Sequence, residues 1–220
     1  MDLVLYGHPF SSYCQKVLVA LDELGLAFTF RVLGSPDDPE ANAEFAALWP
    51  IRRMPVLVDE GRTVVESSVI VEHLSLRAPG PARLLPGDPQ AALESRKMDR
   101  FFDNYVMAPM QKVVLDHLRP EGERDAYGVA EARRLLDAAY GWLDGAMEGR
   151  AWAAGAEFGL ADCAAAPSLF YADWVHPIPE DLARTRAFRA RLLARPSMAR
   201  AVDAARPYRP YFPPGAPDRD

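Results

Sequence analysis

Residues 3–32 read LVLYGHPFSSYCQKVLVALDELGLAFTFRV. The apolar run from Leu3 to Tyr6 is typical of a buried strand, because it is short and is followed by glycine and proline. Apolar residues then recur at helical spacing until Gly25 ends the segment, and the run from Phe28 to Val32 predicts a second strand. A strand, a helix and a second strand in this order predict a right-handed crossover between parallel strands.

The next part of the chain predicts a second helix and a hairpin. A helix is expected from Ala41 to Leu48, and strands are expected at Val56 to Asp59 and Thr63 to Glu66. Gly61 lies between these strands, where a hairpin needs a residue that tolerates positive φ, so they should pair antiparallel. With a further helix from Ser68 to Arg77, the order β-α-β-α-β-β-α predicts a mixed four-stranded sheet with helices.

Prolines and glycines are concentrated between residues 79 and 89, where no helix or central strand would accept them. We therefore expect an α/β domain at residues 1–78, a linker at 79–89 and an all-helical domain at 90–220. Pro109 should kink or split the first helix of the second domain, and the tail from Pro207 to Asp220 should be irregular. The expected helices of this domain are Ala91 to His117, Glu123 to Met147, Leu160 to Trp174 and Asp181 to Ala194.

The charge of the chain argues against a nucleic-acid surface. The formal net charge is −6 and the pI is about 5.3, whereas phosphate binding needs a clustered excess of Lys and Arg. A basic stretch does occur between Arg184 and Arg200, but its arginines spread around a helix axis, which is typical of a solvated face. We expect no nucleic-acid partner.

Composition and cysteine usage indicate an intracellular globular protein. No apolar run reaches the roughly 18 residues that a membrane span requires. Asp2 stands where a secretory signal would carry basic residues, so we expect a cytoplasmic protein with no membrane partner. Cys14 and Cys163 lie far apart in predicted helices and should be buried, reduced thiols. The histidines show no metal-ligand spacing, so we expect no metal.

The segment Ser11-Ser12-Tyr13-Cys14 lies where a helix begins directly after a strand. Unpaired backbone N–H groups and the positive end of the helix dipole favour an anion there, and a thiolate is one such anion. The segment resembles the Cys-Pro-Tyr-Cys of glutaredoxins with serine in place of the first cysteine, so thiol–disulfide exchange is disfavoured. Alternatively, Ser11 or Ser12 only caps the helix and Cys14 is a small core residue. Tyr6 either donates to a thiolate or packs within its strand.

Two further pairs lie at the ends of predicted strands. Met54-Pro55 opens the third strand, a position that tolerates proline. Glu66-Ser67 ends the fourth strand, where Ser67 could simply cap the next helix and Glu66 could be a solvated strand end. The residues alone leave these ordinary roles open.

Taken in order, these motifs resemble those of the glutathione S-transferase superfamily over nearly the whole chain. The resemblance rests on the strand, the serine helix start, Met54-Pro55, Glu66-Ser67, the Pro-rich linker and the helical domain. The serine motif is similar to that of the bacterial, theta and zeta types. Residues 153–162 are similar to a helix-capping element of the family, and Arg195-Pro196-Ser197 adds support. The resemblance implies a thioredoxin-like first domain followed by an all-α domain.

The sequence departs from the family pattern at two places. Gly159 stands where a capping Ser or Thr is usual, and glycine should weaken the cap by only a few tenths of a kcal/mol. Residues 49–53 replace the commoner Asn-Pro-x-Gly-Lys, and Arg53 falls where the family lysine often lies. Arg53 is therefore our candidate for binding the glycine carboxylate of glutathione.

The resemblance implies that glutathione is bound as a co-substrate. The Met54 backbone would pair with the cysteinyl amide, as extended peptides do at exposed strand edges, and the Met54-Pro55 bond would be cis. Glu66 and Ser67 would bind the γ-glutamyl amine and carboxylate. Ser11 is our first candidate for the residue that donates a hydrogen bond to the sulfur.

Ser12 and Tyr6 compete with Ser11 for the catalytic role. A hydrophobic electrophile would lie between the domains, and our candidates for binding it are Phe10, Tyr105, Met107, Met110 and Trp174, which could equally be core residues. The reaction could be a conjugating transfer or a glutathione-dependent isomerisation or dehalogenation, and the chain could also be a non-catalytic binding module.

The resemblance also implies a homodimer. Phe101, Phe102 and Tyr105 would supply aromatic surface for it, unless they simply pack in the core.

Overall fold

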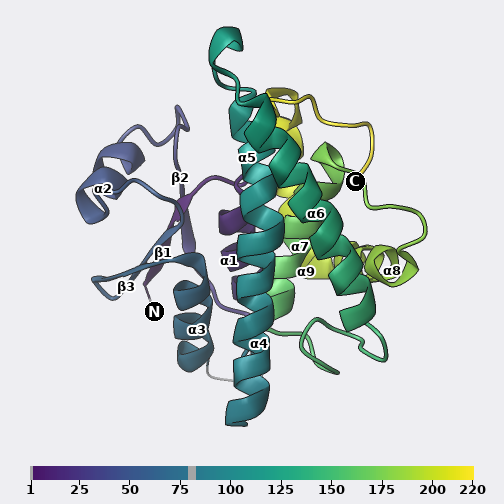
Figure 1. Ribbon diagram of the computed structural model, residues 1–220. Coiled ribbons are helices and arrows are strands. Elements are labelled where there is room, and N and C mark those ends of the chain that lie inside the picture. The colour runs from purple at the N-terminus through teal and green to yellow at the C-terminus, as the bar shows by residue number, and fades with distance from the viewer. Residues whose placement is uncertain (1, 79–82) are drawn as a thin grey trace.

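The computed structural model describes residues 2–78 and 83–220, and its first part is a mixed sheet (Figure 1). The strand order is β2-β1-β3-β4, with β2 parallel to β1 and with β3 antiparallel to both β1 and β4. This confirms the predicted mixed four-stranded sheet and its antiparallel hairpin. The strands are β1 (Leu3–Gly7), β2 (Thr29–Val32), β3 (Val56–Asp59) and β4 (Arg62–Val65).

Alternate residues of the strands face two separate cores. Leu5 and Leu57 pack with α1 (Ser12–Glu23) and α3 (Ser67–Arg77) in the large core that continues into the second domain. Tyr6 and Val56 point to the other face, where α2 (Ala41–Leu48) completes a small core. In Figure 1, α2 lies on one side of the sheet, and α1 and α3 lie on the side of the helical domain.

The second domain is helical, as predicted. The expected helix over 91–117 is divided by the π-helical segment η1 (Phe102–Met107), in which Ala108 N donates to Asp103 O. The division follows from Pro109, which lacks the N–H that would continue the α-helical ladder. The helices are α4 (Pro89–Phe101), α5 (Ala108–Asp116), α6 (Ala126–Ala146), α7 (Leu160–Val175), α8 (Ala183–Leu193) and α9 (Pro196–Ala205).

Helix α7 is the central element of the molecule, because its residues from Leu160 to Trp174 are all buried. It packs against α1 and α4, so it is the main contact between the helical domain and the first domain. Cys163 on α7 and Cys14 on α1 are both buried free thiols, which confirms that prediction. Residues 79–82 of the predicted linker lie outside the described residues. No helix in the described ranges is long and apolar enough to cross a membrane.

A buried charge cluster joins the two domains. Lys16 of α1 is fully buried, and its Nζ lies 2.6 Å from Asp99 Oδ1 and 2.9 Å from Asp103 Oδ2. The same ammonium donates to Ser68 Oγ at 2.8 Å. Arg100 binds both aspartates, at 2.7 Å and 2.6 Å, so two cations balance two carboxylates.

The basic stretch between residues 184 and 200 is largely exposed, as expected: Arg184, Arg186, Arg191 and Arg200 are exposed, and Arg189 and Arg195 are partly buried. The stretch is divided between α8 and α9, and α9 was not predicted. Each of its arginines bonds to another element or to the loop that leads into its helix. Arg195 binds Glu23 at 2.6 Å and Arg200 binds Asp22 at 2.5 Å, so α9 is held to the end of α1. The other partners are Asp144 for Arg184, Ile178 O for Arg186, Asp173 for Arg189 and Ala151 O for Arg191.

Candidate functional site

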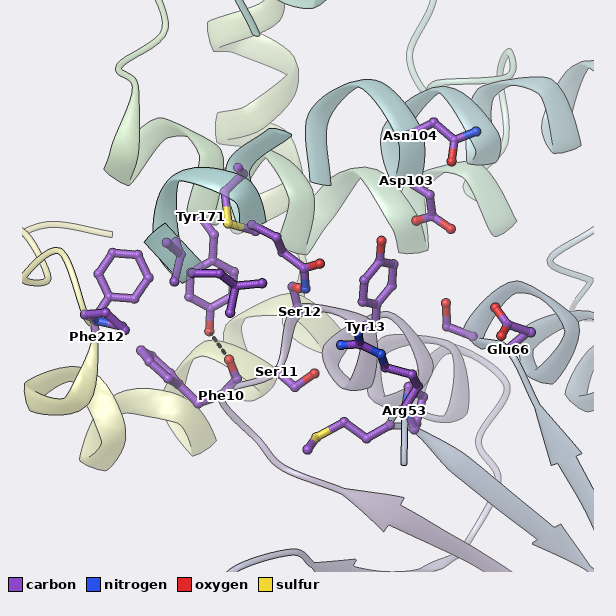
Figure 2. Close-up of a pocket in the computed structure, with 18 of the residues that line it drawn as sticks. Phe10, Ser11, Ser12, Tyr13, Arg53, Glu66, Asp103, Asn104, Tyr171 and Phe212 are labelled. Carbon is purple, nitrogen blue, oxygen red and sulfur yellow. Dashed lines mark hydrogen bonds between the residues drawn. The ribbon is translucent and has the colours of Figure 1, made fainter. Parts of the chain in front are cut away.

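A cavity of about 710 Å³ lies between the two domains. The start of α1, the loop before β3 and the start of α3 form one wall, and η1, α5, α7 and the segment after α9 form the other. Figure 2 shows side chains of both walls directed into it. The predicted site residues that line it are Phe10, Ser11, Ser12, Arg53, Met54, Pro55, Glu66, Ser67 and Met110.

Ser11 is the N-cap of α1. Its Oγ accepts a hydrogen bond from Cys14 N at 3.4 Å, so its hydroxyl hydrogen is free to be donated. Ser12 is the first residue of the helix and is buried at the cavity wall. The backbone N–H groups of this first turn make the wall favourable for an anion.

Cys14 lies behind these serines and does not line the cavity. Burial raises its pKa to about 11, so the thiol stays neutral at physiological pH. Cys14 is therefore a core residue, as its place on the apolar face of the helix predicted.

Tyr6 points away from the cavity. Its hydroxyl donates to Glu44 Oε2 of α2 at 2.6 Å, on the opposite face of the sheet from α1. Burial and the Glu44 carboxylate raise the pKa of Tyr6 to about 12. Strand alternation explains this orientation, because Leu5 faces α1 and its neighbour Tyr6 must face the other way.

The loop before β3 carries the Met54-Pro55 bond, which is cis as predicted. Arg52 has a φ of 56°, a left-handed conformation that is uncommon for a residue other than glycine. Arg52 and Arg53 both line the cavity, and neither forms an ion pair with a described residue. Two guanidinium groups are therefore available to an anionic group at this end of the cavity.

Glu66 is the N-cap of α3, and its side chain makes no capping hydrogen bond. Ser67 is instead the first residue of the helix, so its suggested capping role is wrong. Glu66 has a φ of 69°, which costs an ordinary residue about 1–3 kcal/mol. The strained residue and the start of α3 lie together at the cavity wall.

The structure places three of the five predicted electrophile-binding residues outside the cavity. Met107 is fully buried in the helical core, and Trp174 packs against Phe170 and Phe212. Tyr105 is 49% exposed and packs against Phe101 on the outer surface. Regular helical periodicity could not place Tyr105 and Met107, because both lie in η1, where the helical register changes. Trp174 lies on α7, whose residues from Leu160 to Trp174 are all buried, so periodicity gives this helix no cavity face.

Several lining residues were missed by the sequence analysis. Tyr13 lies beside Ser12 in Figure 2, and burial and the Asp103 charge raise its pKa to about 12, so its phenol stays protonated. Its position within the serine motif could have drawn attention to it. Arg52 lies beside Arg53 in the segment that replaces the family pattern, and could have been named with it. The others come from distant elements and carried no motif: Arg100, Asp103, Asn104, Gln111, Val114, Leu115, Tyr171, Tyr211, Phe212 and Pro213.

Two family models match the chain. The model of the glutathione S-transferase N-terminal domain matches residues 5–82, and the model of the C-terminal domain matches residues 101–196. The chain belongs to the glutathione S-transferase family. The chain is similar to glutathione S-transferase GstB of Escherichia coli, with 28% identity over 171 residues that cover 76% of this chain and 82% of the relative.

Other relatives cover more of the transferase. FtsZ-localized protein A of Caulobacter vibrioides is 28% identical over 206 residues, which cover 89% of each chain. A transferase of Methylobacterium radiotolerans, solved in complex with glutathione sulfonate, superposes with a TM-score of 0.75 at 29% identity and covers 92% of this chain and 95% of its own. A transferase of Methylobacillus flagellatus, solved with glutathione bound, gives a TM-score of 0.79 at 26% identity, covering 90% and 98%.

Family membership supports a general role in glutathione binding and transfer. Among the described residues, no group of three or more His, Cys, Asp or Glu side chains is arranged to hold a metal ion. The polar groups that line the cavity are hydroxyl, carboxylate, amide and guanidinium groups.

Proposed function

We propose that this transferase binds glutathione in the cavity between its domains and uses the bound thiolate to attack a hydrophobic electrophile. One observation carries the proposal. Ser11, Met54 and Glu66 come from three separate segments of the first domain and line one cavity. Apolar side chains of the helical domain, Met110 and Phe212 among them, line the opposite wall.

Each charged part of glutathione has a partner of suitable chemistry. The start of α3 suits the γ-glutamyl carboxylate, because Glu66 and Ser67 line the cavity and the N-cap side chain makes no capping bond, and Glu66 suits the amine. The Met54 backbone would pair with the cysteinyl amide. Arg53, with Arg52 beside it, suits the glycine carboxylate.

Ser11 would activate the thiol. A thiol with a pKa of about 8.5 is only a few per cent thiolate at neutral pH, and lowering the pKa by about two units makes it mostly thiolate, at about 1.4 kcal/mol per unit. A hydrogen bond from Ser11 Oγ to a charged sulfur contributes roughly 1.5–3 kcal/mol, which is the right size. The N-terminus of α1 adds a favourable field.

In the chemical step, the sulfur would form a bond to an electrophilic carbon. The thiol proton leaves to solvent before the attack, and the leaving group of the electrophile takes the electron pair of the bond that breaks. Phe10 and Met110 are the predicted contacts for the electrophile that line the cavity. The protonated Tyr13 phenol also lines it and can donate a hydrogen bond to a polar group of the electrophile.

A panel of electrophiles assayed with glutathione tests the reaction. Turnover of a generic aromatic halide supports conjugation, whereas activity only on a substrate such as maleylacetoacetate supports isomerisation, and release of halide from an alkyl halide supports dehalogenation. Tight glutathione binding without any turnover contradicts catalysis and supports a binding module. A binding module is worth testing for, because one relative, which aligns with 89% of the chain, is named for its localisation to FtsZ and not for an activity.

We also propose that the transferase is a homodimer. Large apolar side chains are exposed on α3, α4, η1 and α6, including Leu76 at 87%, Leu93 at 60% and Tyr105 at 49%. Phe101 and Phe102 are buried, so of the three aromatic residues named for the dimer only Tyr105 is exposed. Tyr105 and the half-exposed Trp142 both pack against Phe101, so their exposed rings lie close together on this surface. Light scattering should give twice the chain mass of 24.4 kDa, and a monomer mass at micromolar concentration would count against the dimer.

A further inference from the structure

The loop between β1 and α1, residues His8 to Ser11, has nearly every backbone polar group bonded. Ser11 N donates to His8 O at 3.0 Å, and Phe10 N donates to His8 Nδ1 at 3.1 Å. Ser11 O accepts from Gln15 N at 2.9 Å. Pro9 O accepts from Gln15 Nε2 at 3.0 Å. Phe10 O accepts from the Tyr171 hydroxyl at 3.1 Å.

Tyr171 is the member of this set that comes from the other domain. It lies on α7 and is 3% exposed, and the dashed line in Figure 2 joins its hydroxyl to Phe10. The hydroxyl also accepts from Gln15 Nε2 at 3.0 Å, so it uses its one hydrogen on the loop and one lone pair on α1. The Tyr171 hydroxyl therefore links α7 of the helical domain to both the loop before Ser11 and helix α1.

Gln15 shows that the arrangement is kept at a cost. Its side chain is fully buried, and both amide hydrogens are donated, to Pro9 O and to Tyr171. Its Oε1 has no hydrogen-bond partner among the described residues, and a buried acceptor left unpaired costs about 1–3 kcal/mol. An apolar side chain at position 15 would avoid that cost but would supply no donors. The useful groups of Gln15 are therefore its two N–H donors, which bind Pro9 O and the Tyr171 hydroxyl.

The carbonyl of Phe10 and the N–H of Ser11 belong to one peptide plane. That plane is held at both ends, by Tyr171 on the carbonyl side and by His8 O on the amide side. A peptide plane held at both ends fixes the positions of the Ser11 N and Cα atoms, which lie in that plane. The Ser11 carbonyl is held in turn by Gln15 N at 2.9 Å, so the planes on both sides of Ser11 are held and the direction of its Cα–Cβ bond is set. The Ser11 hydroxyl is thereby aimed, although Tyr171 does not touch Ser11.

We propose that Tyr171 is a positioning residue that aims the Ser11 hydroxyl at the glutathione sulfur from the helical domain. The inference rests on the proposed function of Ser11 and extends it. The ring of Tyr171 lines the cavity and meets the Phe10 ring edge-on with centroids 5.5 Å apart, so the same residue forms part of the wall for the electrophile. The domain that receives the electrophile thus holds the loop that activates the thiol.

The test compares Tyr171→Phe with Tyr140→Phe. Both tyrosines are buried on helices of the same domain, and each donates to a backbone carbonyl at 3.1 Å, Tyr171 to Phe10 O and Tyr140 to His176 O. Both variants keep the ring and lose the bond that the hydroxyl donates, and Tyr171→Phe also loses the bond accepted from Gln15 Nε2. Tyr140→Phe therefore controls for the loss of a buried tyrosine hydroxyl elsewhere in the same domain.

In Tyr171→Phe, amide hydrogen exchange of the peptide containing Phe10 and Ser11 should become about tenfold faster. The thiolate pKa of bound glutathione should rise by about 0.5–1 unit, and kcat should fall about fivefold or more with KM for glutathione within about twofold. Tyr140→Phe should leave the exchange of this peptide and the thiolate titration unchanged. In a Ser11→Ala background, Tyr171→Phe should add no further shift, because the two residues act through one hydroxyl.

Unchanged exchange of the Phe10–Ser11 peptide in Tyr171→Phe overturns the inference whatever glutathione does. Faster exchange without a change in the thiolate titration overturns it as well, and so does a full additional shift in the Ser11→Ala background. If the wild-type protein binds glutathione but shows no lowered thiolate pKa, or does not bind it, the proposed function fails first and the role of Tyr171 fails with it.

Discussion

Helices α1 and α7 begin in opposite surroundings. At the start of α1, Ser11 makes one long cap bond of 3.4 Å, and the first turn faces a cavity. At the start of α7, Asp162 is fully buried and accepts from Gly159 N at 3.0 Å and from Ala153 N at 2.8 Å. The comparison teaches that the same backbone donors serve a ligand where they are left open and serve stability where the chain satisfies them itself.

The largest effect should come from Asp162→Ala at the closed helix start. The change leaves the buried N–H of Ala153 and the partly buried N–H of Gly159 without an acceptor, at about 1–3 kcal/mol each, so we expect a loss of about 2–6 kcal/mol in unfolding free energy. Urea denaturation of the variant measures it. Asp203→Ala is the control, because that carboxylate is exposed and pairs only with Arg206. A loss no greater than that of the control would mean that the cap bonds do not hold α7.

Ser11→Ala tests the open helix start. Turnover should fall about 10- to 100-fold with little change in glutathione affinity, because the lost hydrogen bond forms only with the charged sulfur. Following the thiolate absorbance of bound glutathione against pH should show the pKa moved upward. Ser12→Ala and Tyr6→Phe are measured beside it. If one of these shifts the titration and Ser11→Ala does not, the activating role passes to that residue.

Gly159→Ser sharpens the comparison, because it would place the usual family cap residue at α7. A Cβ at Gly159 would lie 2.7 Å from Leu84 O, the carbonyl that accepts from Leu160 N at 2.6 Å. The added side chain should therefore destabilise the protein by about 1–2 kcal/mol rather than strengthen the cap. Gly141→Ser on α6, where a Cβ meets open space, is the control. A rise in thermal midpoint for Gly159→Ser would contradict this steric explanation.

The comparison also extends to pH, because the two helix starts should respond with opposite signs. Burial lowers the pKa of His8, so the folded state resists protonation and stability should rise as pH increases through about 6.5. Burial raises the pKa of Asp162 to about 7, so stability should fall as pH rises from about 4 to about 7. Urea midpoints measured across this range should no longer show the rise in stability assigned to His8 in the variant His8→Asn. The asparagine side-chain oxygen can still accept from Phe10 N, so the loop bond is kept. In Asp162→Ala, the midpoints should no longer show the fall in stability between about pH 4 and about pH 7. An unchanged pH profile in both variants would rule out both assignments.

The elements of the first domain could be predicted because local pattern decides them. Helix α2 and strand β3 begin and end at the predicted residues, and Gly61 marks the hairpin turn with a φ of 85°. Helix α9 was missed because its arginines made the stretch look like a solvated surface only, whereas they also pair with acids of α1 that are distant in sequence. The π-helical turn before Pro109 was expected only as a kink, since its hydrophobic periodicity is that of an ordinary helix.

The candidate site divides in the same way. The motif residues Ser11, Met54 and Glu66 could be predicted from their order along the chain, and they line the cavity. Tyr171 and Asp103 could not, because only the packing of α7 and η1 against the first domain brings them there. The sequence also could not explain Gly159, which looked like a weakened cap. The group that excludes a side chain there is the carbonyl of Leu84, in the segment before α4, and only the fold brings it close.

The buried cluster around Lys16 limits how the two domains can be exchanged between related proteins. Its cation belongs to the first domain, and its carboxylates, Asp99 and Asp103, belong to the second. A chimera that joined this first domain to the helical domain of a relative without those acids would bury an ammonium group without a counter-ion, at a cost of several kcal/mol. Recombination between relatives must therefore carry Lys16 and its acids together, so the two domains evolve as a matched pair.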